Sequence, residues 1–224
     1  MFRVVSGFIL SQGLIQAMTL VIGIAIVHLL SVEQFALYSV AGAILVVVGM
    51  GSDFGMSQAF ISVGSSRRED RAYIGALFNS VSWWTRRFMV VATMISIAFS
   101  YLLFMNSNWS ASVMIAATLI VILIGLAQVG SKIARGVLNI HHDARSLFQV
   151  SLAESGIRMA LLPLCLIWPS AILVLLVNFI SSFIASRIAV YRSSRFMERS
   201  ARGGPEERKA LIGFVAPLAP IIVY

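Results

Sequence analysis

An uncharged stretch of 44 residues, from Phe88 to Ser131, limits the possible folds of this chain more than any other feature. As one α-helix it would measure about 66 Å, roughly twice the thickness of a hydrocarbon core. The stretch must therefore fold back on itself. Its only polar, turn-forming cluster is Asn106–Ser110, which lies at its middle. We predict two membrane spans, 88–105 and 111–131, joined by a short turn at the membrane surface.

Other long apolar runs predict further spans by the same reasoning. With 59% hydrophobic and 12% charged residues, the chain carries more apolar surface than a soluble fold of 224 residues can bury. The alternating pattern of barrel strands is absent, so the predicted fold is all-α, a polytopic membrane helix bundle. Its six spans are 5–30, 35–60, 88–105, 111–131, 147–167 and 170–190. A last uncharged run, 210–224, is read as the truncated start of a seventh helix and of a second lobe.

The basic residues predict the orientation of these spans. Sixteen of the seventeen Lys and Arg fall in segments on one side of the predicted membrane, and the turns on the other side hold none. The positive-inside rule places that side, including the N-terminus, in the cytoplasm. The net charge of +8 is therefore a topological signal, and nucleic acid is not an expected partner. The segments are Arg3, 67–87, 132–145 and 187–209.

Two segments outside the spans have distinct patterns. Residues 72–85 are apolar at helical spacing and predict an amphipathic helix on the cytoplasmic leaflet. In the alternative, the third membrane helix begins near Tyr73 and carries Arg86 and Arg87 into the bilayer. The stretch 191–209 is rich in Arg and contains two glycines and a proline, so we predict a basic cytoplasmic linker that follows a six-helix lobe, 1–190.

Arg158 is the one basic residue predicted to lie inside a span. Counted from Arg145, it lies about 20 Å along the helix, past the midplane of a core about 30 Å thick. A charge there is costly unless it has a partner or faces water, so it is a candidate substrate-binding residue. Glu154 precedes it by one helical turn and is a candidate proton or ion carrier. An internal ion pair that locks helix packing remains the alternative.

Three further polar residues within predicted spans are candidates. Gln12 and Gln16 lie one turn apart in the first span, where they either line a substrate path or hold helices together. Asp53 lies in the sequence Gly-Ser-Asp-Phe-Gly, where a helix break would let it carry a proton or cation, or simply cap a helix.

The pattern of histidines and acids predicts no metal site, no cofactor and no catalytic residues. The three histidines have no metal-ligand partners at useful spacing, and the outer turns hold one acid, Glu33. No phosphate-binding Walker loop is present, which excludes ATP hydrolysis by this chain. We therefore expect a protein that is not an enzyme.

Four short segments carry a recognisable pattern: 30–39 (LSVEQFALYS), 51–56 (GSDFGM), 134–138 (ARGVL) and 146–149 (SLFQ). They resemble the polysaccharide flippases, the O-antigen and exopolysaccharide exporters of the multidrug, oligosaccharidyl-lipid and polysaccharide exporter superfamily. The first outer turn and the end of the second span are similar to the family pattern, although Ala36 replaces its usual glycine. Similar segments also include the fourth loop and the fifth helix with Arg158.

The resemblance implies two six-helix lobes around a central cavity in the bacterial inner membrane, with this chain supplying the first lobe. It implies a substrate of undecaprenyl-pyrophosphate-linked oligosaccharide and coupling to a proton or cation gradient. Arg158 is the residue that matches a pyrophosphate-binding cation. Expected partners are the lipid-linked oligosaccharide, membrane lipids, and the polymerase and glycosyltransferases of polysaccharide assembly. The alternatives are a drug exporter of the same superfamily, and a scaffold or enzyme of polysaccharide assembly.

Overall fold

The computed structural model describes residues 2–105, 109–198, 200–201 and 203–215, and within these ranges every regular element is helical. Six segments of this part are long and apolar enough to cross a membrane, which confirms the predicted all-α membrane bundle. The fifth combines a long helix with a short one, separated at Pro163. They are α1 (Phe2–Leu29), α2 (Val32–Asp53), α4 (Arg71–Met105), α5 (Ala111–Ile140), α6 (Ala144–Leu161) with α7 (Leu164–Ile167), and α8 (Ala171–Ser193).

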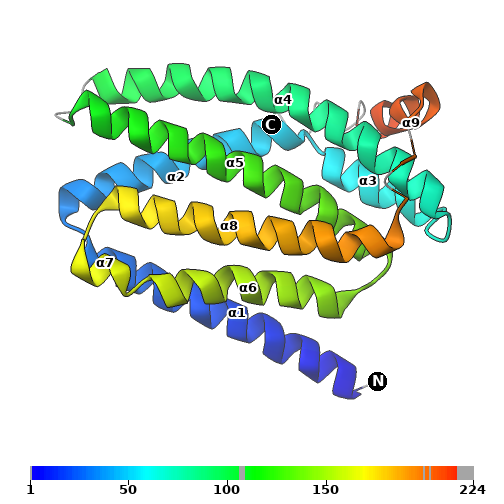
Figure 1. Cartoon of the computed structure of the whole chain (residues 1–224), viewed down its shortest axis with the longest axis horizontal. Coiled ribbons are helices and arrows are strands. Elements are labelled where there is room, and N and C mark those ends of the chain that lie inside the picture. Colours follow the sequence, from blue (N-terminus) through cyan, green and yellow to red (C-terminus); the bar gives the residue numbers. More distant parts are fainter. Residues whose placement is uncertain (1, 106–108, 199, 202, 216–224) are drawn as a thin grey trace.

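The long helices lie alongside one another, with α5 and α8 at the centre (Figure 1). In that view α4, α5, α8, α6 and α1 follow one another, and α2 packs across α4, α5 and α8. A Cβ at Gly125 would lie 2.7 Å from Cγ1 of Val48, so a glycine is needed where α5 meets α2. The Gln34 side chain accepts a hydrogen bond from the backbone N–H of Ala171 at 2.8 Å, which anchors the start of α8 to α2.

The predicted second span, 35–60, is wrong at its inner end, because α2 stops at Asp53 and a separate helix, α3 (Met56–Ser65), follows. Phe54 and Gly55 have positive φ angles of 39° and 76°, which end one helix and redirect the chain into the next. Gly55, the last residue of the motif Gly-Ser-Asp-Phe-Gly, adopts its positive φ at little steric cost because it has no Cβ.

The predicted surface helix 72–85 is not a separate element, because α4 is continuous from Arg71 to Met105. Its apolar residues Ile74, Leu77 and Val81 are buried in a core cluster with Phe60 of α3 and with α5. The apolar face that was predicted to lie on lipid is therefore packed against α3 and α5. The helix contains no proline that would break it, and its start at Arg71 matches the alternative in which the third membrane helix begins near Tyr73.

The predicted linker 191–209 is packed against the bundle and is partly helical. After α8 come a short 3₁₀ turn, Ser194–Phe196, and then α9 (Pro205–Val215). The backbone N–H of Glu198 donates to the carbonyl of Arg71 at 3.0 Å, and the Asn79 amide donates to the carbonyl of Ala201 at 2.7 Å. Leu211 is fully buried in the core cluster around α3 and α4.

Two predictions fall partly on residues outside the described ranges. Residues 106–108 of the predicted outer turn lie outside the described ranges. Helix α4 ends before this turn, at Met105, and α5 begins after it, at Ala111. Residues 216–224 of the predicted seventh helix also lie outside, while 210–215 belong to α9.

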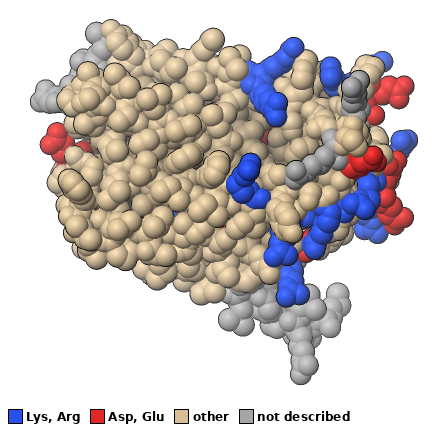
Figure 2. Space-filling model, viewed as in Figure 1, with Lys and Arg blue, Asp and Glu red and all other residues tan. Residues whose placement is uncertain are grey.

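The charges gather at one end of the bundle. On the face shown in Figure 2, Lys and Arg cluster at the end that carries α3 and α9, and the middle of the bundle is almost free of charge. The opposite end shows only a small acidic patch on this face. This distribution agrees with the alternation of basic and uncharged turns in the sequence.

Candidate functional site

A cluster of charged and hydroxyl side chains lies between α5, α6 and α8, three helices of the segments that are long and apolar enough to cross a membrane. Glu154 of α6 accepts from Arg135 of α5 at 2.6 Å through one carboxylate oxygen. Its other oxygen accepts from Arg158, one helical turn along α6, also at 2.6 Å. We call Arg135, Glu154 and Arg158 the ionic triad.

Helix α8 supplies the third wall of the site through small polar residues. The Arg158 Nε donates to the Ser181 hydroxyl at 3.1 Å, and the Ser182 hydroxyl lies 3.4 Å from the Glu154 carboxylate. Both serines are almost fully buried. Their small size lets α8 approach α6 closely while still offering hydrogen bonds to charged groups.

The triad is partly shielded from its surroundings and carries an excess positive charge. The side chains of Arg135, Glu154 and Arg158 are 29%, 19% and 26% exposed. One carboxylate neutralises only one of two guanidinium groups, so the cluster has a formal charge of +1. In surroundings poor in water, such an excess favours the approach of an anion.

A small cavity of about 150 Å³ opens beside the triad. Gln128, Ser131 and Lys132 of α5 line it together with Arg135, Glu154 and Ser182. The Ser131 hydroxyl and the Arg135 Nε are buried and have no hydrogen-bond partner within the described residues. Buried polar groups are normally satisfied, so these two atoms mark a place where a ligand or ordered water belongs. The Lys132 ammonium lies 3.3 Å from the carbonyl of Gly49 on α2.

The sequence prediction paired Glu154 with Arg158 correctly but assigned Arg135 and Lys132 to a loop, which is wrong. Helix α5 continues to Ile140, so both residues lie on it. A charge that follows a long apolar run commonly marks the end of a membrane helix, so the sequence predicts both residues outside the span. The signal was present in the spacing of Gln128, Ser131, Lys132 and Arg135, which recur on one helical face.

The structure does not bring the other predicted site residues to the triad. Gln12 and Gln16 are exposed on α1, and no hydrogen bond within the described residues joins them to the cluster. An added Cβ at Gly13 or Gly23 would meet nothing within 4 Å, so this side of α1 is open. The Asp53 carboxylate accepts from the Ser57 N–H at 3.0 Å and hydroxyl at 2.7 Å, which caps α3.

A second charged group holds the start of α6 at the basic end of the bundle. Asp143 accepts from the Ser146 N–H at 3.2 Å and forms an ion pair with Arg195. Burial alone would raise the pKa of Asp143, but the hydrogen bonds from Ser146 and the charge of Arg195 outweigh it and lower that pKa. The group fixes the direction in which α6 enters the bundle.

The described residues contain no group of three or more His, Cys, Asp or Glu side chains arranged to hold a metal ion. The side chains of the triad and its cavity offer guanidinium, carboxylate, ammonium, amide and hydroxyl groups. These side chains can bind an anion and exchange ion-pair partners.

Comparison with known proteins identifies a family. The model of the polysaccharide biosynthesis protein family matches residues 3–217, nearly the whole chain. No curated protein and no solved structure matches the chain. Because the family match covers far more than half of the sequence, this multi-pass membrane protein belongs to the polysaccharide biosynthesis protein family.

Proposed function

We propose that the protein flips undecaprenyl-pyrophosphate-linked oligosaccharide across the bacterial inner membrane. The ionic triad beside an open cavity is the observation that carries this proposal, because it places two arginines within helices that are apolar enough to span a bilayer. Membership of a polysaccharide biosynthesis family supports a glycan-bearing cargo.

The geometry of the triad supports recognition of a diphosphate. Guanidinium groups form paired hydrogen bonds with phosphate oxygens, and such charge-assisted bonds are among the strongest in proteins. In the structure, Glu154 occupies both arginines. An arriving pyrophosphate would compete with this carboxylate, and a displaced Glu154 could then accept a proton. Binding of substrate and uptake of a proton would thus be linked at one residue.

The distribution of charge supports the proposed orientation. Lys and Arg gather at one end of the bundle in Figure 2, and the N-terminal end of α1 and the start of α6 lie at that end in Figure 1. The N-terminus is accordingly proposed to be cytoplasmic. The lipid-linked oligosaccharide would then enter from the basic side, where the carrier lipid is loaded.

The remaining predicted residues have proposed roles around the same pathway. The exposed face of α1 with Gln12 and Gln16 is available to contact the sugar or a second six-helix lobe. Asp53 is proposed as a second ion-coupling carboxylate at the break between α2 and α3, in addition to its capping role. Polymerase and glycosyltransferases of polysaccharide assembly are proposed partners.

The experiment compares Arg135→Ala and Arg158→Ala with Arg145→Ala in a strain that depends on this protein for surface polysaccharide. Arg145 is an exposed residue at the start of α6 that forms no ion pair within the described residues, which makes it a matched control. We expect the triad variants to lose surface polysaccharide and to accumulate complete lipid-linked oligosaccharide on the cytoplasmic side, while the control exports normally.

Other outcomes would reject the proposal. Failure to assemble the lipid-linked oligosaccharide would indicate an enzyme or scaffold of assembly. Normal export by both triad variants would show that the ionic triad is not the transport site. Drug sensitivity of these variants together with normal export would indicate a drug exporter. Membrane levels of each variant are measured in parallel, so that loss of protein is separated from loss of transport.

A further inference from the structure

A long groove runs between α4 and α5, on a different side of α5 from the ionic triad. A hollow of about 780 Å³ extends along both helices and is lined mainly by apolar side chains, among them Met89, Val90, Met94 and Leu126. A second hollow of about 340 Å³ continues it and shares Ile97 and Ile122. The two hollows therefore form one groove.

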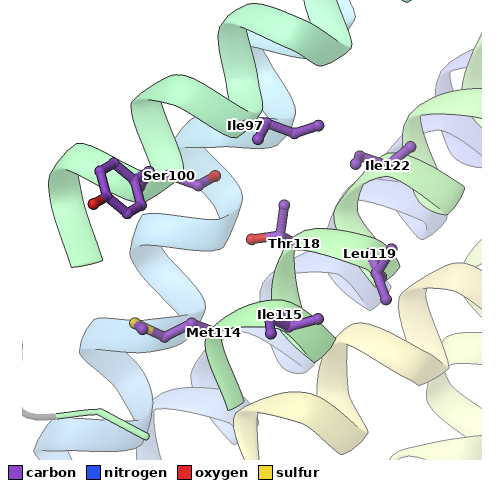
Figure 3. A pocket seen from close by; sticks show the side chains of 8 residues that line it. Ile97, Ser100, Met114, Ile115, Thr118, Leu119 and Ile122 are labelled. Atoms are coloured by element: carbon purple, nitrogen blue, oxygen red, sulfur yellow. The ribbon is translucent and has the colours of Figure 1, made fainter. Parts of the chain in front are cut away.

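Figure 3 shows the second hollow, where Ile97 of α4 and Ile122 of α5 point toward one another. No charged residue lines this part. Many side chains along the groove are well exposed, including Met94 at 66% and Leu126 at 53%. Such a continuous apolar hollow is filled by lipid chains when the helices lie in a bilayer.

The other end of the groove is basic and polar. A hollow of about 370 Å³ lined by Asn79, Trp83 and Arg87 opens there, and it shares Ser82, Arg86 and Val90 with the large apolar hollow. Arg86 is exposed and makes no hydrogen bond or ion pair within the described residues.

A pair of arginines frames Trp83 beside this polar mouth. The guanidinium carbon of Arg87 lies 3.6 Å from the centre of the Trp83 ring, and that of Arg208 on α9 lies 4.5 Å from it. Tryptophan and arginine together are typical of the level at which lipid headgroups lie. The mouth is therefore positively charged and suited to a phosphate.

The length of the large apolar hollow, measured from the basic mouth, fits one leaflet. From Arg86 to Ile97 the helix rises by about 16 Å, close to half of a hydrocarbon core about 30 Å thick. The second hollow continues beyond that point and has no charged residue at its lining. A lipid held by its headgroup at Arg86 would thus place its chain in the large hollow and end near Ile97 and Ile122.

From this geometry we infer that the groove between α4 and α5 is a binding site for an anionic phospholipid of the cytoplasmic leaflet. The lipid phosphate is held by Arg86 with Arg87 beside it, and one acyl chain lies along Met94 and Leu126. Basic hollows between helices on the cytoplasmic side have this preference for anionic headgroups. The site is separate from the ionic triad and does not depend on the proposed transport function.

The test measures lipid retention by the purified protein. The protein is reconstituted in vesicles of phosphatidylglycerol and phosphatidylcholine at one to four, extracted in mild detergent, and its retained lipids are quantified by native mass spectrometry. The variants are Arg86→Gln at the mouth and Leu126→Trp in the groove. Their matched controls are Arg145→Gln and Leu123→Trp, since Leu123 is also exposed on α5 but does not line the groove.

The wild-type protein and both controls are expected to retain phosphatidylglycerol in preference to phosphatidylcholine. Loss of one arginine near a lipid headgroup should weaken retention about fivefold. Leu126→Trp should reduce retention of either lipid by filling the groove. Unchanged phosphatidylglycerol retention in both test variants, or equal retention of the two lipids by the wild-type protein, would overturn the inference.

A competition arm separates the phospholipid from a lipid carrier. Long-chain polyprenyl phosphate is added at the same concentration as phosphatidylglycerol. Continued retention of phosphatidylglycerol supports the inference, and its complete displacement from the Arg86-dependent site would assign the groove to the carrier and overturn it.

Discussion

At the scale of single residues, the ionic triad has two physical roles that can be separated. Glu154 balances two arginines within the bundle, so the cluster both fixes α5 against α6 and presents positive charge to a cavity. A buried ion pair contributes little net stability when compared with apolar residues of similar volume, but loss of one partner is costly. Substitution of one member of the triad should therefore destabilise the protein more than replacement of all three members by apolar residues.

We predict that Glu154→Gln lowers the free energy of unfolding by about 1–3 kcal/mol, because it leaves two guanidinium groups without a carboxylate. The combined variant Arg135→Met, Glu154→Leu and Arg158→Met should recover most of this stability but export no polysaccharide. The measurements are thermal unfolding in detergent and export in cells. Export by the triple variant would show that the triad serves only to pack the helices.

Asp143 gives a prediction about pH, because its pKa is lowered in the folded protein. A lowered pKa means that the carboxylate contributes stability that is fully present above its ordinary value of 3.8 and is lost as the pH falls through the folded value. Asp143→Asn should therefore unfold at a lower temperature than the wild type at pH 7, and the difference should narrow below about pH 4.

Thermal unfolding between pH 7 and pH 3 checks this prediction. Glu33→Gln is the control, because Glu33 is exposed and forms no ion pair within the described residues. If the difference caused by Asp143→Asn stays constant down to pH 3, the ion pair with Arg195 does not stabilise the start of α6.

The residues of the site were only partly predictable from the sequence. Arg158 and Glu154 could be found because charges are rare in long apolar runs and because one helical turn separates them. Arg135 could not be assigned in the same way, because the helical spacing of Ser131, Lys132 and Arg135 indicates that the helix continues but does not identify a partner on another helix. Its partner is 19 residues away in the sequence and on another helix.

At the scale of elements, the junction of α2 and α3 depends on a small motif. Asp53 caps α3 through Ser57, and Gly55 adopts a positive φ of 76°. A capping role requires an oxygen acceptor, whereas ion coupling requires a titratable carboxylate. Asparagine retains the acceptor and removes the charge.

We predict that Asp53→Ala lowers the free energy of unfolding by about 1 kcal/mol, while Asp53→Asn leaves it nearly unchanged. Thermal unfolding checks the cap. Export by the same two variants checks the proposed coupling role: Asp53→Asn should export poorly although it remains stable. Normal export by the asparagine variant would leave Asp53 with the capping role alone.

Helix α4 is bound to the segment after α8 at a position that only glycine fits. A Cβ at Gly75 would overlap the backbone carbonyl oxygen of Glu198, which cannot move without displacing the segment that leads to α9. We predict that Gly75→Ala lowers the free energy of unfolding by about 1–3 kcal/mol and raises hydrogen exchange in α9.

Gly42→Ala is the matched control, because an added Cβ there meets nothing within 4 Å. It should be neutral or slightly stabilising through its higher helix propensity. Equal effects of the two substitutions on thermal unfolding would contradict close packing of the segment against α4.

The elements were predicted best where their ends are marked by strong local signals. The turn around Pro169 separates α7 from α8 as expected, since proline and short polar residues interrupt helices. Helices α4 and α5 end and begin on either side of the polar cluster before Ala111. The start of α4 at Arg71 corresponds to the alternative, a helix beginning near Tyr73, and not to the preferred prediction of a surface helix over 72–85. Its first three turns form an apolar stripe, and a stripe facing lipid has the same pattern as one facing α3 and α9.

At the scale of the whole molecule, the six candidate membrane spans of the described residues could be predicted from the uncharged runs and the turns between them, whereas their arrangement could not. Nothing in the sequence indicates that α5 and α8 are central and that α1 lies at the edge beside α6 (Figure 1). The role of Ser181 and Ser182 on α8 becomes clear only from their contacts with Arg158 and Glu154 on α6. The arrangement is what creates both the triad and the groove between α4 and α5.

Translocation by purified protein tests the central proposal most directly. The protein is reconstituted in liposomes whose inner leaflet carries a fluorescent undecaprenyl-pyrophosphate-linked oligosaccharide, and a glycosidase is added outside. We predict that the wild type and Arg145→Ala expose the oligosaccharide to cleavage under a proton gradient, while Arg158→Ala leaves it protected as in empty liposomes. Equal protection in wild-type and empty liposomes, or equal cleavage with wild type and Arg158→Ala, would contradict flipping through the ionic triad.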